Sequence, residues 1–275
     1  MKTVLTIAGT DPSGGAGLQA DLKTMTALGT YGMAVTTAIV VQNTCGVSRV
    51  ELLPPDLILA QLEAVLSDIP PDAVKIGMVG GAAALTALSR RLSGLSCPIV
   101  VDPVMVSTSG HRLLEPRAQA ALERGLLPLA TVMTPNLPEA EALLRRPIPD
   151  RAAMEQAAAD LAGRYPGAIL IKGGHLAGHC DDLLWAQGRP HWLPGTRVDT
   201  TNTHGTGCTL STALSCGLAQ GLSLEEAARR AKAYVAGGLR AGLALGRGNG
   251  PLDHTWNRQN DGWARTLDSG VEPNL

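Results

Sequence analysis

The residues best suited to chemistry lie in one short turn, His204-Gly205-Thr206-Gly207-Cys208, which precedes a segment of helical composition. The unpaired N–H groups and the dipole of a helix N-terminus bind anions. The same field can lower the pKa of a cysteine thiol. The turn therefore predicts an anion site formed by the amides of Gly205, Thr206 and Gly207, with Cys208 beside it as a base. The alternative is that Cys208 is a small buried apolar side chain beneath a tight turn.

A second glycine-rich turn spans residues 9–17, with the sequence GTDPSGGAG. Gly9 and Gly14 have the spacing of a P-loop, but Gly15-Ala16 stands where that motif requires Lys and Ser or Thr. The G-x-G-x-x-G fingerprint of dinucleotide-binding folds is also missing here. The loop therefore favours close approach of a small ligand to bare backbone, with Asp21 one helical turn further on as a hydrogen-bond acceptor. A structural turn with a solvated Asp21 is the alternative.

Two acidic residues and one lysine follow predicted strands or begin a predicted helix. Asp102 ends an apolar run, and Glu139 falls in the first turn of a helix that begins near Asn136. Buried carboxylates usually have a partner, and Mg²⁺ takes one or two carboxylates together with phosphate oxygens. Asn136-Leu137-Pro138-Glu139 equally matches a capping box, so both interpretations stay open. Lys172, followed by Gly173, could neutralise a phosphate or extend to the surface.

Together these groups fit phosphoryl transfer without a P-loop, a reaction in which positioning and electrostatics supply most of the acceleration. The base, the amides and the lysine each have a role in that chemistry. His175, His179 and His191 lack the spacing of a metal site and are expected on the surface or in a hairpin.

Short β-branched runs alternate with segments of helical period along the chain, which predicts an α/β fold with a mostly parallel sheet. The predicted strands cover residues 3–9, 33–41, 74–79, 98–102, 131–134 and 168–172. The predicted helices cover residues 18–28, 56–66, 82–92, 118–126, 139–144, 151–164, 207–220 and 224–244. Residues 181–186 and 190–194 predict an antiparallel hairpin at a sheet edge. Glycine or polar residues follow nearly every strand, so we expect them along one rim, where ligands bind to parallel sheets.

Composition narrows the class of protein further. The 275 residues carry 23 Lys and Arg against 24 Asp and Glu, without a basic block, so nucleic acid and anionic membranes are not expected as partners. No apolar run approaches the length of a membrane span, and the N-terminus fits a first strand better than a signal peptide, which predicts a cytoplasmic protein. Five widely spaced cysteines without a C-x-x-C pair predict reduced thiols. We expect one domain over residues 1–254 and a polar tail over residues 255–275.

Several segments make the chain similar to the hydroxymethylpyrimidine and phosphomethylpyrimidine kinases of thiamine biosynthesis, within the ribokinase-like superfamily. The resemblance extends from Thr3 to about His254. It rests on AGTDPSGGAG at 8–17, VQNT at 41–44, KIGM at 75–78, VDPVM at 101–105, TPNLPEA at 134–140 and HGTGC at 204–208. It implies a three-layer α/β/α fold, with helices on both faces of the central sheet.

The resemblance also implies a function. Such an enzyme uses ATP and Mg²⁺ to phosphorylate 4-amino-5-hydroxymethyl-2-methylpyrimidine and then its monophosphate, and a homodimer is expected. Gln42 would read the pyrimidine through its amide. The implied substrate pocket also includes Gly9, Ala16, Asp21, Met78 and Val104; the nucleotide site includes Asn136, Lys172, Gly173, Thr206 and Gly207; the metal region includes Asp102 and Glu139; and Cys208 is the expected base.

Three other functions remain as alternatives. Pyridoxal and pyridoxine kinases are similar, and their substrates also carry a hydroxymethyl group on a six-membered nitrogen ring. A nucleotide-binding regulator without catalysis is disfavoured because the base, the acidic pair and Lys172 are all present. A dinucleotide-dependent oxidoreductase lacks its glycine fingerprint.

Overall fold

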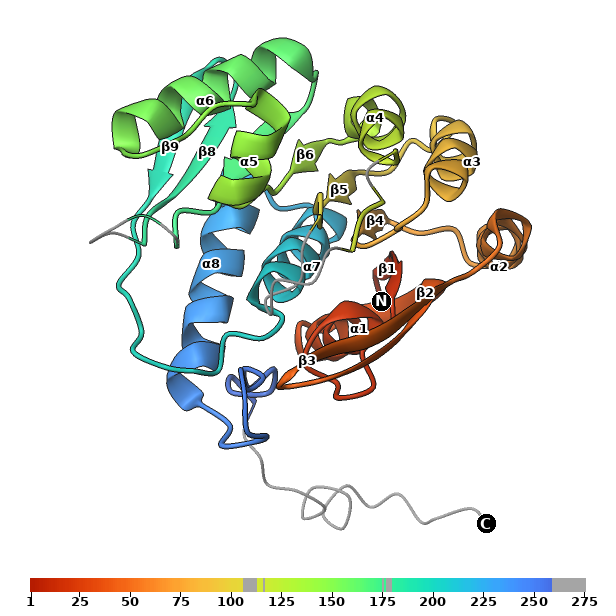
Figure 1. The fold of residues 1–275 in the computed structure, drawn as a ribbon, viewed down its shortest axis with the longest axis horizontal. Coiled ribbons are helices and arrows are strands. Elements are labelled where there is room, and N and C mark those ends of the chain that lie inside the picture. The colour runs from red at the N-terminus through yellow and green to blue at the C-terminus, as the bar shows by residue number, and fades with distance from the viewer. Residues whose placement is uncertain (106–112, 116, 175, 177–179, 259–275) are drawn as a thin grey trace.

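A single nine-stranded sheet organises the part of the chain that the structure describes. The computed structural model describes residues 1–105, 113–115, 117–174, 176 and 180–258 (Figure 1). The strand order is β3-β2-β1-β4-β5-β6-β7-β8-β9. The strands are β1 (Thr3–Gly9), β2 (Tyr31–Asn43), β3 (Gly46–Leu52), β4 (Ala73–Ile76), β5 (Ile99–Val101), β6 (Val132–Met133), β7 (Ala168–Ile171), β8 (Asp182–Ala186) and β9 (Arg189–Leu193). The strands from β2 to β7 in this order pair in parallel, whereas β3, β8 and β9 are antiparallel to their neighbours.

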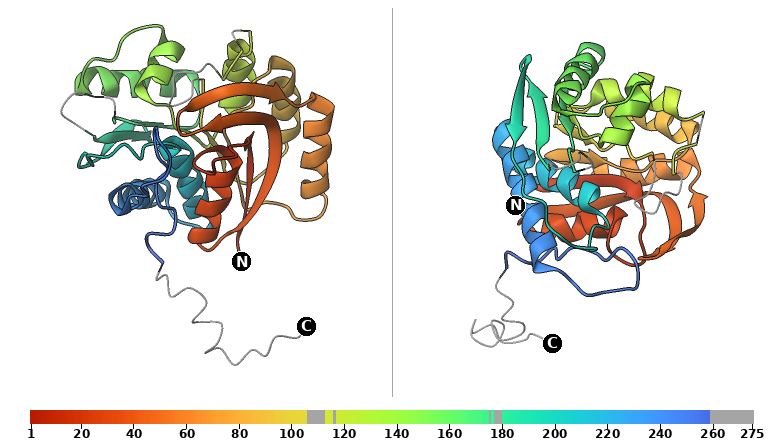
Figure 2. Two further views of the ribbon diagram at one scale, coloured as in Figure 1. Left: turned by 60° about the horizontal axis from the view of Figure 1, so that its bottom comes forward. Right: turned by 60° about the vertical axis from the view of Figure 1, so that its left-hand side comes forward.

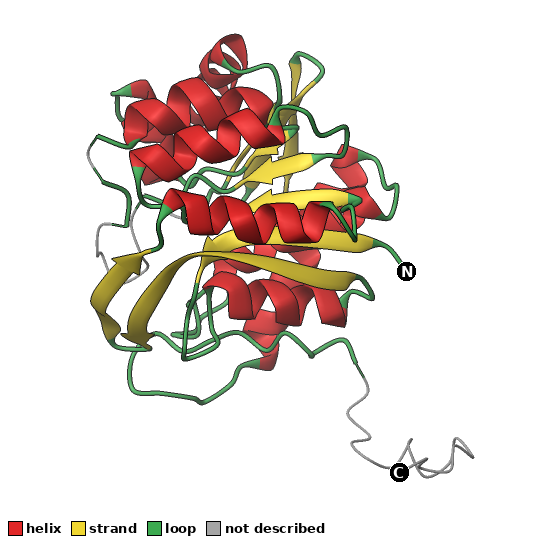
Figure 3. Cartoon of the chain, turned by 90° about the vertical axis from the view of Figure 1, so that its right-hand side faces the viewer, coloured by secondary structure: helices red, strands yellow, loops and turns green. Residues whose placement is uncertain are grey.

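Helices cover both faces of this sheet (Figure 3). They are α1 (Gly17–Ala27), α2 (Pro55–Leu66), α3 (Ala82–Leu92), α4 (Gln119–Ala121), α5 (Leu137–Leu144), α6 (Arg151–Arg164), α7 (Thr206–Ala219) and α8 (Leu224–Ala241). The first face packs against α2, α3, α5, α6 and the π-helical turn Leu122–Leu126 that follows α4, and the second face packs against α1, α7 and α8. The three-layer α/β/α expectation is therefore confirmed.

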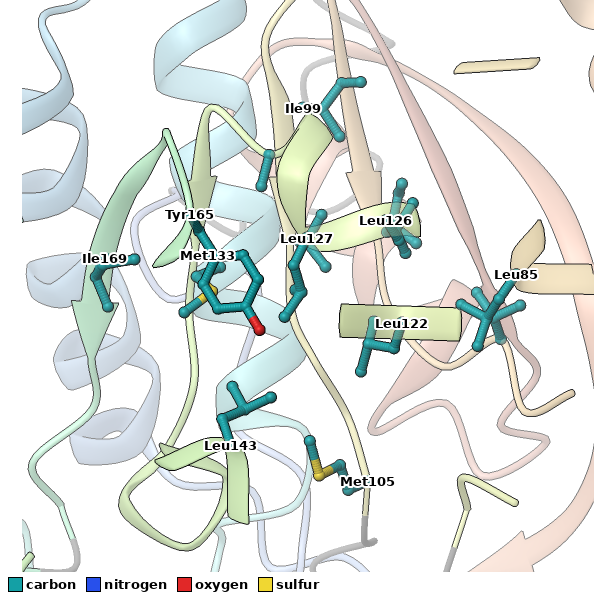
Figure 4. Close-up of a cluster of buried hydrophobic side chains, with 14 of the residues drawn as sticks. Leu85, Ile99, Met105, Leu122, Leu126, Leu127, Met133, Leu143, Tyr165 and Ile169 are labelled. Carbon is teal, nitrogen blue, oxygen red and sulfur yellow. The ribbon is translucent and has the colours of Figure 1, made fainter. Parts of the chain in front are cut away.

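The central strands are buried on both faces, so their sequences read as continuous apolar runs. Their side chains alternate between the two helical layers. In β1, Leu5 and Ile7 join the core under α2 and α3, whereas Val4 joins the core under α1. In β5, Ile99 joins the first of these cores and Val100 faces α7 and α8. Figure 4 shows part of the larger core, where Ile99, Met133 and Ile169 of the sheet meet Leu122, Leu126 and Leu143 of the helices.

The structure confirms most of the predicted elements, changes one of them and adds a strand. The hairpin predicted at 181–186 and 190–194 is β8–β9, at one edge of the sheet. The opposite edge carries a second hairpin, β2–β3, whose strand β3 the sequence reasoning missed (Figure 2). The helix predicted over 118–126 is instead the short α4 followed by the π-helical turn. Among the helices in the described ranges, none combines the length and apolar composition needed to cross a membrane.

The chain packs beyond the predicted start of the tail. Trp256 Nε1 donates a hydrogen bond of 3.0 Å to the carbonyl of Tyr234 on α8, and the two rings lie 6.2 Å apart. Arg258 bonds the carbonyl of Thr26 at the end of α1. Residues 255–258 therefore form a turn against two helices. The rest of the predicted tail, 259–275, lies outside the described residues, as do His175 and His179.

Candidate active site

A cavity of about 1170 Å³ opens at the carboxyl ends of the parallel strands, where the sequence reasoning expected the polar loops to meet. Its walls include residues that follow β1, β4, β5, β6 and β7, residues near the end of β2, and the turn before α7. The predicted site residues that line it are Gly9, Ala16, Gln42, Met78, Asp102, Val104, Asn136, Glu139, Lys172, Gly205, Thr206, Gly207 and Cys208. Two predicted residues, Asp21 and Gly173, do not line it.

The two glycine-rich turns pack against each other at the N-terminus of α7. Gly205 has φ +80°, and a Cβ atom there would lie 1.8 Å from the carbonyl oxygen of Gly15. A side chain at 205 would therefore clash with the first turn as well as strain the backbone. Asp11 fixes the first turn, because its carboxylate accepts hydrogen bonds from the amides of Gly15 and Ala16.

The N-terminus of α7 presents unsatisfied donors to the cavity. Gly205 is the N-cap of this 14-residue helix, and its left-handed backbone conformation sets the direction in which the chain enters the helix. Among the residues that the structure describes, no acceptor is found for the N–H groups of Gly207 and Cys208. Both residues line the cavity. Such amides at the positive end of a helix dipole can bind a phosphate group.

Cys208 lies in this wall and is half-buried. Burial raises the pKa of its thiol to about 11, Lys75 opposes that rise, and Asp21 and Asp102 add to it. The amide of Gly17, at the start of α1, bonds the sulfur and lowers the pKa slightly. The prediction that the helix field would bring this pKa towards neutrality is therefore wrong for the protein alone, because desolvation outweighs it.

A lysine joins the two acidic residues beside the start of α7, since a Cβ atom at Gly207 would lie 3.2 Å from Lys172 Nζ. Lys172 Nζ lies 2.8 Å from Asp102 Oδ1 and 3.9 Å from Glu139 Oε2. Burial alone would lower the pKa of Lys172, but the two carboxylates outweigh it and raise that pKa. Asp102 also accepts a hydrogen bond of 3.1 Å from Thr134 Oγ1. The partner expected for Asp102 is therefore an ammonium group, and Lys172 is not a surface side chain.

Glu139 combines the two roles that the sequence left open. The Asn136 side chain accepts from the Glu139 amide at 2.8 Å, and Glu139 Oε2 accepts from the Asn136 amide at 2.8 Å, which completes a capping box. The same carboxyl group lines the cavity. Burial raises the pKa of Glu139 to about 7, which Lys172 opposes and Asp102 reinforces.

Asp21 occupies a different place from the predicted one. Its side chain is fully buried beneath the cavity, where it accepts a hydrogen bond of 2.8 Å from Lys75 Nζ. Thr6 and Thr212 donate to the same carboxylate at 2.6 and 2.7 Å. Neither the substrate-binding role nor the solvated alternative fits this position, because the neighbours already occupy the carboxylate.

Gly173 is also displaced from its predicted role. Its amide donates to Asp182 Oδ1 at 2.9 Å, and a Cβ atom at 173 would lie 1.8 Å from the carbonyl oxygen of Asp181. The neighbouring Gly174 lines the cavity instead. Gln42 does face the cavity, and its Nε2 lies 3.4 Å from the carbonyl of Thr10, which leaves its amide oxygen available. His191 lies on β9, as expected for a hairpin residue, with Nδ1 3.4 Å from Glu225.

The sequence reasoning missed two lysines that line the cavity. Lys75 is fully buried in the apolar strand β4, and a charge inside such a run is a signal that was available. Lys232, on α8, pairs with the buried Asp182 at 2.7 Å and donates to the carbonyl of Cys180. The sequence pattern of α8 does not distinguish Lys232 from the charged residues on the exposed face of that helix.

The donor set suits a magnesium ion that is shared with phosphates. Within the described ranges, no group of three or more His, Cys, Asp or Glu side chains could enclose a metal ion. Asp102 and Glu139 nevertheless line one cavity, and hard carboxylate oxygens are what Mg²⁺ takes when substrate phosphates and water complete its shell. The residues present therefore fit a phosphate-bound Mg²⁺ and not an all-protein metal site.

Known proteins are similar to this chain in both sequence and fold. The family model described as phosphomethylpyrimidine kinase matches residues 11–253. A hydroxymethylpyrimidine/phosphomethylpyrimidine kinase of Streptomyces coelicolor is 49% identical over 253 residues, which cover 92% of this chain and 94% of that protein. A phosphomethylpyrimidine kinase structure from Clostridium difficile has a TM-score of 0.77 at 43% identity and covers 86% of this chain and 98% of that chain. A pyridoxal kinase of Staphylococcus aureus, solved with ADP, has a TM-score of 0.87 at 38% identity and covers 94% of this chain and 96% of that chain.

Proposed function

This chain belongs to the phosphomethylpyrimidine kinase family, and we propose that it is an ATP-dependent kinase that phosphorylates 4-amino-5-hydroxymethyl-2-methylpyrimidine and then its monophosphate, a step of thiamine biosynthesis. One observation carries the proposal. The amides of Gly207 and Cys208, the Cys208 thiol and the Lys172 ammonium all line one cavity, which is the set of groups that phosphoryl transfer needs.

Each group has a distinct part in the transfer. The amides of Gly207 and Cys208 and the ammonium of Lys172 stabilise the negative charge on the transferring phosphoryl group. The Thr206 amide, which the sequence also placed in the anion site, donates to the carbonyl of Thr203 at 3.4 Å instead. The acceptor hydroxyl oxygen forms a bond to the γ-phosphorus while the bond to the ADP oxygen breaks, and the hydroxyl proton passes to the thiolate form of Cys208, which becomes the neutral thiol. Asn136 and Gly174, which line the cavity, would contact the nucleotide. Asp102 and Glu139 would hold Mg²⁺, which supplies charge neutralisation on the nucleotide phosphates when it is bound.

The pyrimidine occupies the wall formed by Gly9, Ala16, Gln42, Met78 and Val104. The Gln42 amide offers both a donor and an acceptor, which match the edge of an aminopyrimidine. The apolar side chains of Met78 and Val104 suit the faces of the ring. Asp21 and Gly173 have no direct part, because their polar groups are already bonded within the protein.

Pyridoxal kinase of vitamin B6 salvage is the second candidate. The observation that favours it is the TM-score of 0.87 with the Staphylococcus aureus enzyme, against 0.77 with the Clostridium difficile phosphomethylpyrimidine kinase. The sequence relatives favour the pyrimidine, since the Streptomyces coelicolor protein is 49% identical and carries the pyrimidine kinase name. A cytoplasmic homodimer, free of membrane and nucleic acid, is the proposed working form, and sedimentation of the full chain tests the dimer.

Calorimetry on Gln42→Ala tests the assignment of the substrate wall. We expect the affinity for hydroxymethylpyrimidine to fall about tenfold or more, because a buried pyrimidine edge loses its hydrogen bonds. The affinity for ATP should stay unchanged, because Gln42 lies near the end of β2 and the proposed phosphate-binding groups lie on other elements. Gln61→Ala, on α2 away from the cavity, is the matched control. An equal loss of both affinities in Gln42→Ala would contradict the assignment.

A further inference from the structure

A fully buried ion pair lies beneath the N-terminus of α7. Lys75 on β4 and Asp21 on α1 are both 0% exposed, and Lys75 Nζ lies 2.8 Å from Asp21 Oδ2. Thr6 on β1 and Thr212 on α7 complete the shell of the Asp21 carboxylate. Four elements thus converge on one pair of charges. A buried ion pair is weak evidence for stability, since its desolvation offsets much of its attraction, and it calls for another explanation.

The pair is bonded to α7 one helical turn after Cys208. Thr212 follows Cys208 by four residues on α7, so the two side chains share a helix face, and Thr212 Oγ1 donates to Asp21 Oδ1. Lys75 itself lines the cavity together with Cys208. A Cβ atom at Gly77 would lie 2.9 Å from Lys75 Nζ, so the absence of a side chain there leaves room for the ammonium group. The geometry puts a fixed positive charge in the cavity wall that also holds the proposed base.

Lys75 also has hydrogen-bonding capacity that the described part of the chain does not use. An ammonium group carries three donors. Among the described residues, Asp21 is the one hydrogen-bond acceptor found for Lys75. The remaining N–H groups of a fully buried ammonium are costly without a partner. Cys208 lines the same cavity as Lys75.

We propose that Lys75 and Asp21 form a positioning pair for Cys208. Lys75 favours the ionised sulfur. Asp21 holds Lys75 in place and partly offsets its positive charge. This inference rests on the proposed role of Cys208 as the base. Four charged groups act on the thiol: Lys75 and Lys172 are positive, and Asp21 and Asp102 are negative. After the dominant effect of burial, Lys75 lowers the pKa of Cys208 and Asp21 raises it. The two members of the pair therefore act in opposite directions.

Alkylation of the thiol tests this inference without any turnover. Iodoacetamide is applied to the full chain between pH 7 and 10, and modification of the Cys208 peptide is followed by mass spectrometry, with Cys208→Ser as the blank. Lys75→Met should slow the alkylation of Cys208 at pH 8 about tenfold, the effect of a pKa rise of about one unit. Asp21→Asn should accelerate it. Because the rate does not depend on the acceptor or on ATP, failure of the kinase proposal would leave this result unaffected.

Two further variants keep the test decisive. Lys75→Met leaves Asp21 unpaired in the interior and could fail to fold, so the double variant Lys75→Met/Asp21→Asn removes both charges together. Its Cys208 should react more slowly than that of Asp21→Asn. Lys2→Met, which breaks the exposed pair with Asp72, is the control and should react like the wild type. Equal rates in all variants, or a slower reaction in Asp21→Asn than in the wild type, would overturn the inference.

Discussion

Asp11 Oδ2 lies 2.7 Å from Nε2 of His204, although 193 residues separate them in the sequence. The contact joins the two glycine turns, since Asp11 also holds the amides of Gly15 and Ala16. Hydrogen bonds of these groups outweigh burial and lower the pKa of Asp11 below its usual value of 3.8. The carboxylate therefore fixes the anion site at the start of α7 relative to the pyrimidine wall.

Replacing Asp11 with Asn should weaken the contact between the two glycine-rich turns. An amide oxygen cannot replace a carboxylate that accepts several bonds, so we expect a loss of about 1–3 kcal/mol in the free energy of unfolding at pH 7. Because the folded pKa of Asp11 is depressed, the stabilisation is present above pH 3.8 and is lost as the pH falls through the lower folded value. Urea unfolding at pH 7 and pH 3 measures this. The exposed Asp68→Asn should show little change, and an equal difference at both pH values would argue against the role of the charge.

The two glycines that flank α7 allow a matched comparison. Gly205 and Gly221 have φ values of +80° and +84°, so an alanine at either position is strained by about 1 kcal/mol. Only at Gly205 would the new Cβ atom meet backbone, at 1.8 Å from Gly15, while no atom lies within 4 Å at Gly221. We expect Gly205→Ala to lose both stability and activity, and Gly221→Ala to lose about 1 kcal/mol of stability with unchanged kcat/KM. Thermal unfolding and initial rates measure both, and similar activities in the two variants would show that the contact between the turns is dispensable.

Cys208→Ala should retain the fold and lose phosphoryl transfer by about 100-fold or more, the scale of a general base. Because burial raises the pKa of Cys208 to about 11, the thiolate fraction of the wild type grows tenfold per pH unit below that value. The rate of the chemical step should therefore increase between pH 7 and 9, and that of Cys208→Ala should not. Single-turnover kinetics measure both, and the exposed Cys45→Ala serves as the control. Near-normal transfer in Cys208→Ala would remove the thiol from the mechanism.

The raised pKa of Glu139 predicts that its contribution to the free energy of unfolding changes with pH in the opposite direction to that of Asp11. Its folded pKa is raised from 4.5 to about 7, so the folded state binds more protons than the unfolded state between these values. Stability should therefore fall from pH 4.5 to pH 7, on the order of 3 kcal/mol from this group. Glu139→Gln should lack that decline. Chemical unfolding across this pH range measures it, and a Glu139→Gln curve parallel to the wild type would contradict the raised pKa.

The sequence was sufficient to predict the strands of the central sheet, because strands buried on both faces form short apolar runs between glycines and helices. It was not sufficient for β3, since only its pairing with β2 defines that strand and most of its side chains are half or fully exposed. Lys75 was missed because a strand pattern says nothing about which buried position has a counter-charge, and Asp21 lies 54 residues away. The pKa of Cys208 was misjudged for a similar reason: helix position is local, whereas desolvation comes from the whole fold.

The central claim is tested most directly by mass spectrometry of the products formed from hydroxymethylpyrimidine, its monophosphate and pyridoxal, each incubated separately with the full chain, ATP and Mg²⁺. The account predicts the pyrimidine diphosphate from both pyrimidines and no product in the absence of ATP. Cys208→Ala, run in parallel, should give trace product and so exclude a contaminating kinase. Product from pyridoxal alone would contradict the account and move the enzyme to vitamin B6 salvage.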